Sequence, residues 1–145
     1  MGAATVAWVV CEIIRTFAWE SHQAPGQMVF QNKGEMARVW MADGGKEDRM
    51  PKVDFEKETV IAIFAGPKNG TGHRIKIDTV VQTEDQKEGI VLYKTFLPGE
   101  GERASQMTYP NHIVVVRKTT APFRFVAAES EEGKKMIESM KGGKK

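Results

Sequence analysis

Three histidines and one cysteine are the residues of this 145-residue sequence with the clearest potential for catalysis or metal binding. His22, His73 and His112 are too far apart to form the i, i+4 pair with which a helix holds a metal ion. Cys11 lies in an apolar run, and a buried thiol has a raised pKa that makes it a poor nucleophile. The sequence therefore predicts no catalytic residue, no metal site and no cofactor.

The most distinctive segment is residues 66–73, Gly-Pro-Lys-Asn-Gly-Thr-Gly-His. A phosphate-binding loop would place Lys and then Ser or Thr directly after its second glycine, followed by a helix. Here Lys68 comes early and a strand pattern follows, so a phosphate site is not predicted. Two interpretations remain open, a simple connection between strands or a loop whose glycines allow close approach of a protein partner.

A second candidate for partner binding precedes the apolar run at residues 112–118. Tyr109 is of a type enriched at interface hot spots, and Pro110 limits its freedom, although both residues could simply begin a strand. If the strands at 60–65 and 112–118 are antiparallel neighbours, the two segments lie at one end of a sheet. The predicted partner-binding residues are Lys68, Asn69, Gly70, Thr71, Gly72, His73, Tyr109, Pro110 and His112.

Composition excludes several classes of function. The chain carries 21 basic and 19 acidic residues, and this balance does not predict nucleic-acid binding. Basic residues such as Arg74 and Lys76 fit the wet face of a strand and have no aromatic stacking platform between them. No apolar run approaches the roughly 20 residues of a membrane-spanning helix. We therefore expect neither a nucleic-acid partner nor a membrane span; the oligomeric state is not predicted.

The apolar stretch at residues 3–11 does not resemble a signal peptide. No basic residue precedes it, and Glu12 and Arg15 follow where a small-residue cleavage site would be needed. We expect a buried strand with Cys11 as a small core residue. The chain as given is expected to be cytoplasmic, and extracytoplasmic if a leader has been removed.

The elements that must position these segments are mostly strands. Asn32 is a predicted helix N-cap with Glu35 at the capping-box position, which gives a short helix over Lys33–Ala42. Ile75, Ile77 and Val81 are expected to share one strand face. Strand patterns occur at residues 5–14, 28–30, 60–65, 75–81, 90–97, 112–118 and 123–125. This spacing predicts a single mainly β domain, an antiparallel β-sandwich or a partly open barrel.

Residues 129–145 differ from the rest of the chain. They contain five lysines and four glutamates, with Met136, Ile137 and Met140 as a weak apolar stripe. We expect a frayed C-terminal helix or a disordered tail that is dispensable for folding. The predicted organisation is one β domain at residues 1–128 and a charged tail at 129–145.

Several motifs together resemble the PrcB C-terminal domain family. Residues 53–55 form a Val-Asp-Phe entry, residues 58–66 an apolar strand that ends in glycine, and Thr71-Gly72 part of the family's Thr-Gly-Gly-Tyr loop. Further similar features are Trp40 before a charged loop, Ile75 and Ile77, Leu97-Pro98, residues 109–114 and residues 122–125. The resemblance spans residues 30–126. His73 and Arg74 replace the family's second Gly and Tyr, which puts a role borrowed from that pair in question.

The resemblance implies a small, mainly β, non-enzymatic module. The family's namesake is an accessory subunit of a bacterial surface protease complex, so the expected function is an accessory or scaffold subunit that binds a protease. The Thr- and Gly-containing loop is also similar to that of chagasin-type inhibitors, which implies an alternative function as a protease inhibitor. A small enzyme with an unrecognised site is the remote alternative.

Overall fold

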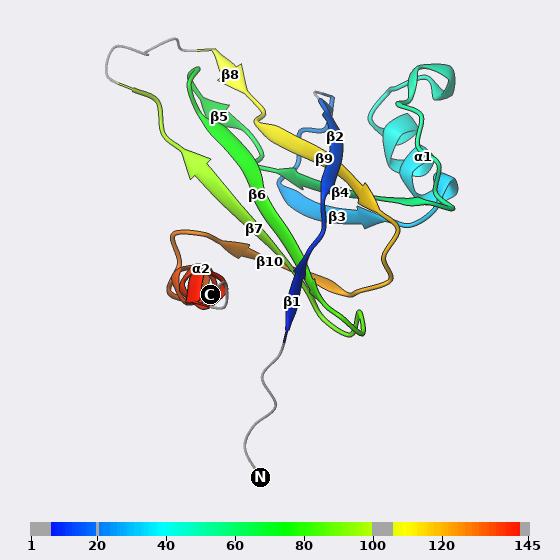
Figure 1. Cartoon of the computed structure of the whole chain (residues 1–145). Helices are drawn as coiled ribbons and strands as arrows, with labels where there is room; N and C mark the ends of the chain where they lie inside the picture. Colours follow the sequence, from blue (N-terminus) through cyan, green and yellow to red (C-terminus); the bar gives the residue numbers. More distant parts are fainter. Residues whose placement is uncertain (1–6, 20, 100–105, 143–145) are drawn as a thin grey trace.

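The computed structural model describes residues 7–19, 21–99 and 106–142, which form two packed β-sheets flanked by helices (Figure 1). The elements are, in chain order, β1 (Trp8–Val10), β2 (Ile13–Phe17), β3 (Gly26–Phe30), α1 (Lys33–Ala42), the 3-10 turn η1 (Glu47–Arg49), β4 (Glu58–Phe64), β5 (Lys68–Asn69), β6 (Arg74–Thr83), β7 (Gly89–Phe96), β8 (Met107–Thr108), β9 (Asn111–Arg117), β10 (Phe123–Ala127) and α2 (Glu131–Gly142).

The strands of the described residues form two four-stranded sheets and one short pair. One sheet has the order β1-β6-β7-β10, the other the order β2-β9-β4-β3, and β5 pairs with β8 beside them. The prediction of a mainly β sandwich is confirmed. One pairing departs from the antiparallel pattern, because β10 runs parallel to β7. The chain crosses from β9 in one sheet to β10 in the other, so β10 enters beside β7 in the same direction.

Strand β4 is buried on both faces, which explains why its sequence is continuously apolar instead of alternating. Ile61 and Ile63 face the core between the two sheets, where they pack with residues of β6, β7 and β9. Val60, Ala62 and Phe64 face the other way, into a second cluster beneath α1. The sandwich therefore needs an outer layer over this sheet, and α1 supplies part of it (Figure 1).

Helix α1 begins and ends at the predicted residues. The side chain of Asn32 accepts a hydrogen bond from the backbone N–H of Glu35 at 2.9 Å. The Glu35 carboxylate reaches back one residue further than expected and accepts from the backbone N–H of Gln31 at 2.9 Å. Two donors at the helix start are thus satisfied, and the fully buried Met36 is held against Trp19 in the outer cluster.

The apolar N-terminal stretch forms two strands in different sheets, not the single buried strand that was predicted; residues 5 and 6 lie outside the described part. β1 pairs with β6, and β2 pairs with β9. Cys11, between them, is buried in the core as predicted, and its N–H donates to the carbonyl of Val80 at 2.7 Å. Val9 and Val10 are 42% and 61% exposed, because β1 lies at a sheet edge.

A register shift at Asp78 changes the face of every later residue of β6. The pairing with β7 slips between Ile77 and Thr79, as in a β-bulge. Ile75, Ile77 and Val80 consequently face the core between the sheets, whereas Val81 faces the opposite side. The prediction that Val81 shares a face with Ile75 and Ile77 was therefore wrong, because simple alternation does not anticipate the extra residue.

The charged segment after β10 forms helix α2, which packs on the outer face of the sheet that contains β7. Met136, Ile137 and Met140 contact the cluster formed by Val81, Ile90, Leu92 and Val126. The hydroxyl of Ser130 accepts from the N–H of Gly133 at 3.0 Å and so caps the helix start. This packing argues against a dispensable tail, while the division of the chain at residue 128 stays a prediction.

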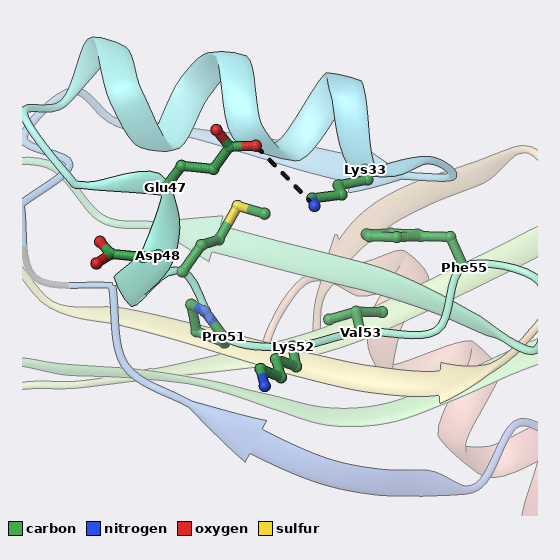
Figure 2. A pocket seen from close by; sticks show the side chains of 8 residues that line it. Lys33, Glu47, Asp48, Pro51, Lys52, Val53 and Phe55 are labelled. Carbon is green, nitrogen blue, oxygen red and sulfur yellow. Dashed lines mark ion pairs between the residues drawn. The ribbon is translucent and has the colours of Figure 1, made fainter.

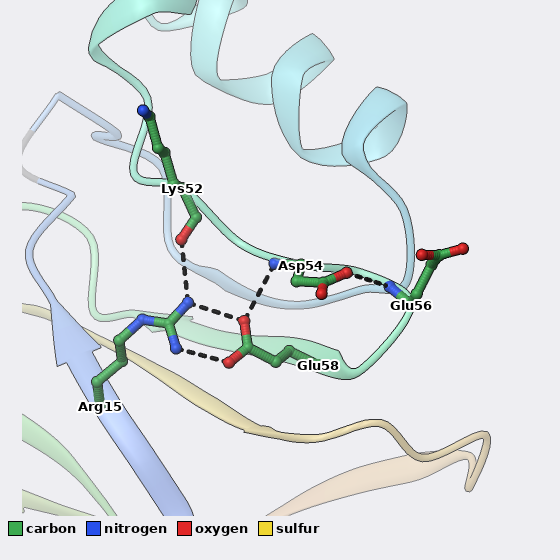
Figure 3. A network of polar contacts seen from close by, with 5 residues as sticks. All are labelled: Arg15, Lys52, Asp54, Glu56 and Glu58. Carbon is green, nitrogen blue, oxygen red and sulfur yellow. Dashed lines mark hydrogen bonds and ion pairs between the residues drawn. The ribbon is translucent and has the colours of Figure 1, made fainter.

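A guanidinium–carboxylate pair ties β2 to the start of β4 (Figure 3). Both terminal nitrogens of Arg15 donate to Glu58, at 2.7 and 2.8 Å, and Nη2 also donates to the carbonyl of Lys52 at 3.0 Å. The N–H of Asp54 donates to the same Glu58 carboxylate at 3.1 Å. The hydrogen bonds from Arg15 hold the pKa of Glu58 at about 2. The network fixes the connection that covers the outer cluster below α1.

Gly133→Ala tests whether α2 is docked. A free helix would gain about 0.5–1 kcal/mol from this change. In the structure the new Cβ would lie 2.0 Å from the carbonyl oxygen of Ala127, so we expect a loss of about 1–3 kcal/mol in the free energy of unfolding, measured in urea. Gly34→Ala in α1 is the matched control, because its Cβ would meet only Asn32 Oδ1 at 3.4 Å. Stabilisation by both substitutions would contradict the docking of α2.

Glu58→Gln tests the pair with Arg15. The folded-state pKa of Glu58 lies below its unfolded value, so the stabilisation is complete above about pH 5 and is lost as the pH falls toward 2. Arg15 is partly exposed, and we expect the variant to lose about 1 kcal/mol at pH 7. The difference from wild type should shrink in unfolding experiments at low pH. Glu56→Gln, at an exposed carboxylate of the same connection, is the control; a pH-independent difference for Glu58→Gln would contradict this account.

Candidate functional site

The two segments predicted to bind a partner meet at one end of the sandwich. β4 and β9 pair antiparallel, from Glu58 opposite Arg117 to Phe64 opposite Asn111, so the end of β4 and the start of β9 adjoin. The N–H of Ala65 donates to the carbonyl of Pro110 at 2.9 Å. Further out, β5 pairs with β8, with Lys68 opposite Thr108. The strand arrangement assumed from the sequence is confirmed.

The glycines of the first segment have backbone conformations that other residues rarely adopt. Gly70 has φ of 111°, donates its N–H to the carbonyl of Gln106 at 2.8 Å and accepts from the Thr108 hydroxyl at 2.9 Å. Gly66 has φ of 79°, and a Cβ there would lie 3.0 Å from Pro25. The glycines thus hold the segment tightly against β8 and the chain before β3, instead of leaving it a loose connection.

The predicted residues differ in how much surface they offer. Asn69 is exposed and Gly70 is buried. The others are half-buried: Lys68, Thr71, Gly72, His73, Tyr109, Pro110 and His112. All nine lie at the same end of the molecule, but their role as partner contacts stays a prediction.

His112 connects the two sheets. Its Nδ1 accepts a hydrogen bond from the backbone N–H of Ile77 at 2.8 Å, directly before the register shift of β6. Burial, and next the nearby charge of Lys76, lower the pKa of His112. The geometry requires Nδ1 to be unprotonated, so the imidazole is neutral with its proton on Nε2.

Three exposed apolar residues near these segments were missed in the sequence. Phe96, Leu97 and Met107 are 44%, 81% and 49% exposed, at the end of β7 and in β8. Residues 66–73 and 109–112 together with these three side chains are called the loop face below. The adjacent apolar residues Phe96 and Leu97, at the end of a predicted strand, were the signal available in the sequence. Their side chains point to opposite faces of the strand, so at least one of them could be expected to be exposed.

Two hollows flank the start of β6 within the loop face. The first, of about 350 Å³, lies between the sheets, and Ile63, Ala65, Tyr93 and Leu97 are among its lining residues. The second, of about 530 Å³, lies between the start of β6 and the start of β9 and is lined by residues 73–76, Phe96 and residues 110–112. The described lining residues include Lys68, Arg74 and Lys76 but no Asp or Glu. The lining of these two hollows, at the end of the molecule that carries the loop face, is therefore apolar and basic.

A larger hollow of about 880 Å³ lies between α1 and the connection to β4 (Figure 2). Its apolar lining, which includes Met50, Val53 and Phe55, packs on the cluster beneath α1. The ion pair between Lys33 and Glu47, 4.0 Å apart, crosses its rim. Because the apolar residues serve the core and these two rim charges face each other, this hollow offers less for binding than the loop face.

A half-buried polar cluster outside the loop face has a structural explanation. Asp43 Oδ2 accepts from Trp19 Nε1 at 2.9 Å and lies 2.8 Å from His22 Nδ1. The His22 ring also packs against Phe64, with centroids 4.3 Å apart. These contacts tie the connection between β2 and β3 to the end of α1. Among the described residues, His22 contacts an acid and aromatic rings and no nucleophile.

Other potential chemistry is limited among the residues that the structure describes. Burial raises the pKa of the Cys11 thiol, which disfavours the reactive thiolate. The described part of the chain contains no group of three or more His, Cys, Asp or Glu side chains placed to hold a metal ion. None of its helices is both long enough and apolar enough to cross a membrane.

The fold and the loop face define a small β-sandwich module with an apolar and basic end. The family model described as PrcB C-terminal matches residues 59–117, from the second residue of β4 to the end of β9. This confirms the resemblance inferred from the motifs, although residues 53–55 and 122–125 lie outside the match. No curated protein sequence and no solved structure matches the chain.

Substitution of His112 should expose its part in stability. The pKa in the folded state lies below the unfolded value, so the wild type should lose stability as the pH falls from 7 to 5. His112→Asn keeps an acceptor near the position of Nδ1 without titrating, and its unfolding free energy should vary less over this range. His112→Ala leaves the Ile77 N–H without this acceptor and should cost about 1–3 kcal/mol. Identical pH profiles for wild type and His112→Asn would contradict this account.

Proposed function

We propose that this chain is a non-enzymatic accessory subunit that binds a protein partner through the loop face, and that the partner is a protease. The observation that carries the proposal is the match to the PrcB C-terminal family. The matched residues contain both partner-binding segments and the three exposed apolar residues. The part of the chain that resembles the family is thus the part that builds the loop face.

The chemistry of the loop face supports a protein partner. Phe96, Leu97 and Met107 offer apolar area that the described residues leave exposed, beside the basic side chains of Lys68 and Arg74. Apolar and aromatic residues at the centre of a patch with a polar rim are typical of protein interfaces. The loops are fixed by backbone hydrogen bonds, so binding would cost little ordering of the chain.

A protease inhibitor is the second candidate function. The feature that favours it is the glycine-containing segment at one end of a rigid sandwich, similar in type to the loops that chagasin-type inhibitors present. No observation on the described residues specifically favours an enzyme. The proposal therefore assigns the chain a binding role.

The test is the affinity of the captured partner for variants of the loop face. A partner is first cross-linked and isolated from a lysate of the source organism, and its affinity for purified chain is then measured. Tyr109→Ala and the pair Lys68→Ala/His73→Ala should each weaken binding by about 1–3 kcal/mol while the fold stays intact. Lys87→Ala, in the exposed turn at the other end of β6 and β7, is the control.

Unchanged affinity in both loop-face variants would place the interface elsewhere. Titration of the partner's proteolytic activity separates the two candidate functions. A scaffold should bind without lowering activity, whereas an inhibitor should abolish activity at one equivalent.

A further inference from the structure

We propose that the edge of β6 at residues 74–76, which pairs with no strand of the described residues on the side away from β7, accepts an extended acidic segment of the partner as an added β-strand. This inference rests on the proposed function and specifies the chemistry of the partner. It follows from three observations at the second hollow of the loop face: an open strand edge, the direction of its backbone groups, and the charges beside it.

The edge is open because the neighbouring strand stops early. β1 pairs only with Val81–Thr83 of β6, and one further bond joins the Cys11 N–H to Val80. β7 occupies the other side of β6 along its length, up to Arg74 opposite Phe96. Within the described residues no strand therefore pairs with the β1 side of β6 before the register shift at Asp78.

The direction of the backbone groups follows from one hydrogen bond. The N–H of Ile77 donates to His112 Nδ1 and so points away from β7, toward β9. Backbone groups two residues apart in a strand point to the same side, so the N–H and C=O of Ile75 also face away from β7. Ile75 lines the hollow between β6 and β9, together with His73 and His112. A partner backbone has a donor and an acceptor to pair with there.

The charges beside this edge specify an acidic partner. Arg74 and Lys76 are exposed, two residues apart on one face of β6, and line the hollow. Neither has an ion-pair partner among the described residues, whereas Lys94 on β7 lies 3.8 Å from Asp78. Side chains of an added strand would alternate in the same way, so acidic residues two apart would lie beside Arg74 and Lys76. Such oppositely charged cross-strand pairs stabilise a sheet and also select the register.

Synthetic peptides test the inference on the purified full chain. The probe is the capped heptapeptide Thr-Glu-Val-Asp-Val-Glu-Thr, and the matched control has Lys at its three acidic positions. Binding is followed through the backbone amide NMR signals of the ¹⁵N-labelled protein. We expect the acidic peptide to shift the signals of Ile75 and its neighbours, with a Kd below about 1 mM, and the lysine peptide to leave them unchanged.

Two changes separate strand addition from simple charge attraction. The double substitution Arg74→Glu/Lys76→Glu should raise the Kd of the acidic peptide at least about tenfold, which corresponds to about 1.4 kcal/mol. The distant substitution Lys87→Glu should have little effect on this Kd. N-methylation of the peptide at the central Asp or at a neighbouring Val should give unequal results, because only one of these N–H groups faces β6.

The inference is overturned by several results. These are no shift at residues 74–77 at about 1 mM peptide, equal binding of the lysine peptide, equal effects of the two N-methyl groups, or equally strong binding of single-stranded DNA. If Tyr109→Ala weakens binding of the partner but the chain does not bind the acidic peptide, the proposed function stands and strand addition is overturned. If the acidic peptide binds at β6 but the loop-face variants do not change the affinity for the partner, strand addition stands and the proposed function of the loop face is overturned.

Discussion

The antiparallel pairing of β4 with β9 is the interaction on which both the core and the loop face depend. Its two strands supply apolar side chains to the inter-sheet core on one face and to the cluster beneath α1 on the other. The same pairing brings residue 65 to Pro110 and thereby joins the two candidate segments. A register change here would exchange the residues of the two clusters and separate the loops, since a slip of one residue turns every side chain to the other face.

The parts of the fold that the sequence predicted are those with a local physical cause. Asn32 and Glu35 mark the start of α1 because capping needs only side chains a few residues apart. The register shift at Asp78 was not predictable in this way, because simple alternation does not reveal an extra residue in the pairing of β6 with β7. The parallel pairing of β10 was not predictable either, because its partner β7 is not the preceding strand of the chain. The docking of α2 has the same origin, since its half-buried Met136 and Ile137 acquire their role only from the sheet beneath them.

The candidate site, like the fold, was predictable from the sequence only where its features have a local cause. The glycines at positions 66 and 70 indicated close backbone approach, and the structure shows what they approach. His112 was singled out as a contact residue, but its bond to Ile77 gives it a role between the sheets as well. The exposure of Leu97 was missed because exposure depends on where the neighbouring elements end, which the residue type does not encode.

The position of the N-terminal strands has a consequence for the order of folding. β2 pairs with β9, and the N–H of Trp19 donates to Asn111 at 3.0 Å, across 92 positions of the chain. Such distant contacts raise the contact order, which slows folding, because a long loop must close before any interaction is gained. On the ribosome, β2 has no partner until β9 has been synthesised, several seconds after β2 itself at about 5–20 residues per second. Strand β2 is thus among the first strands to be made and among the last to be paired, and during that interval its apolar side chains are available to chaperones or to neighbouring chains.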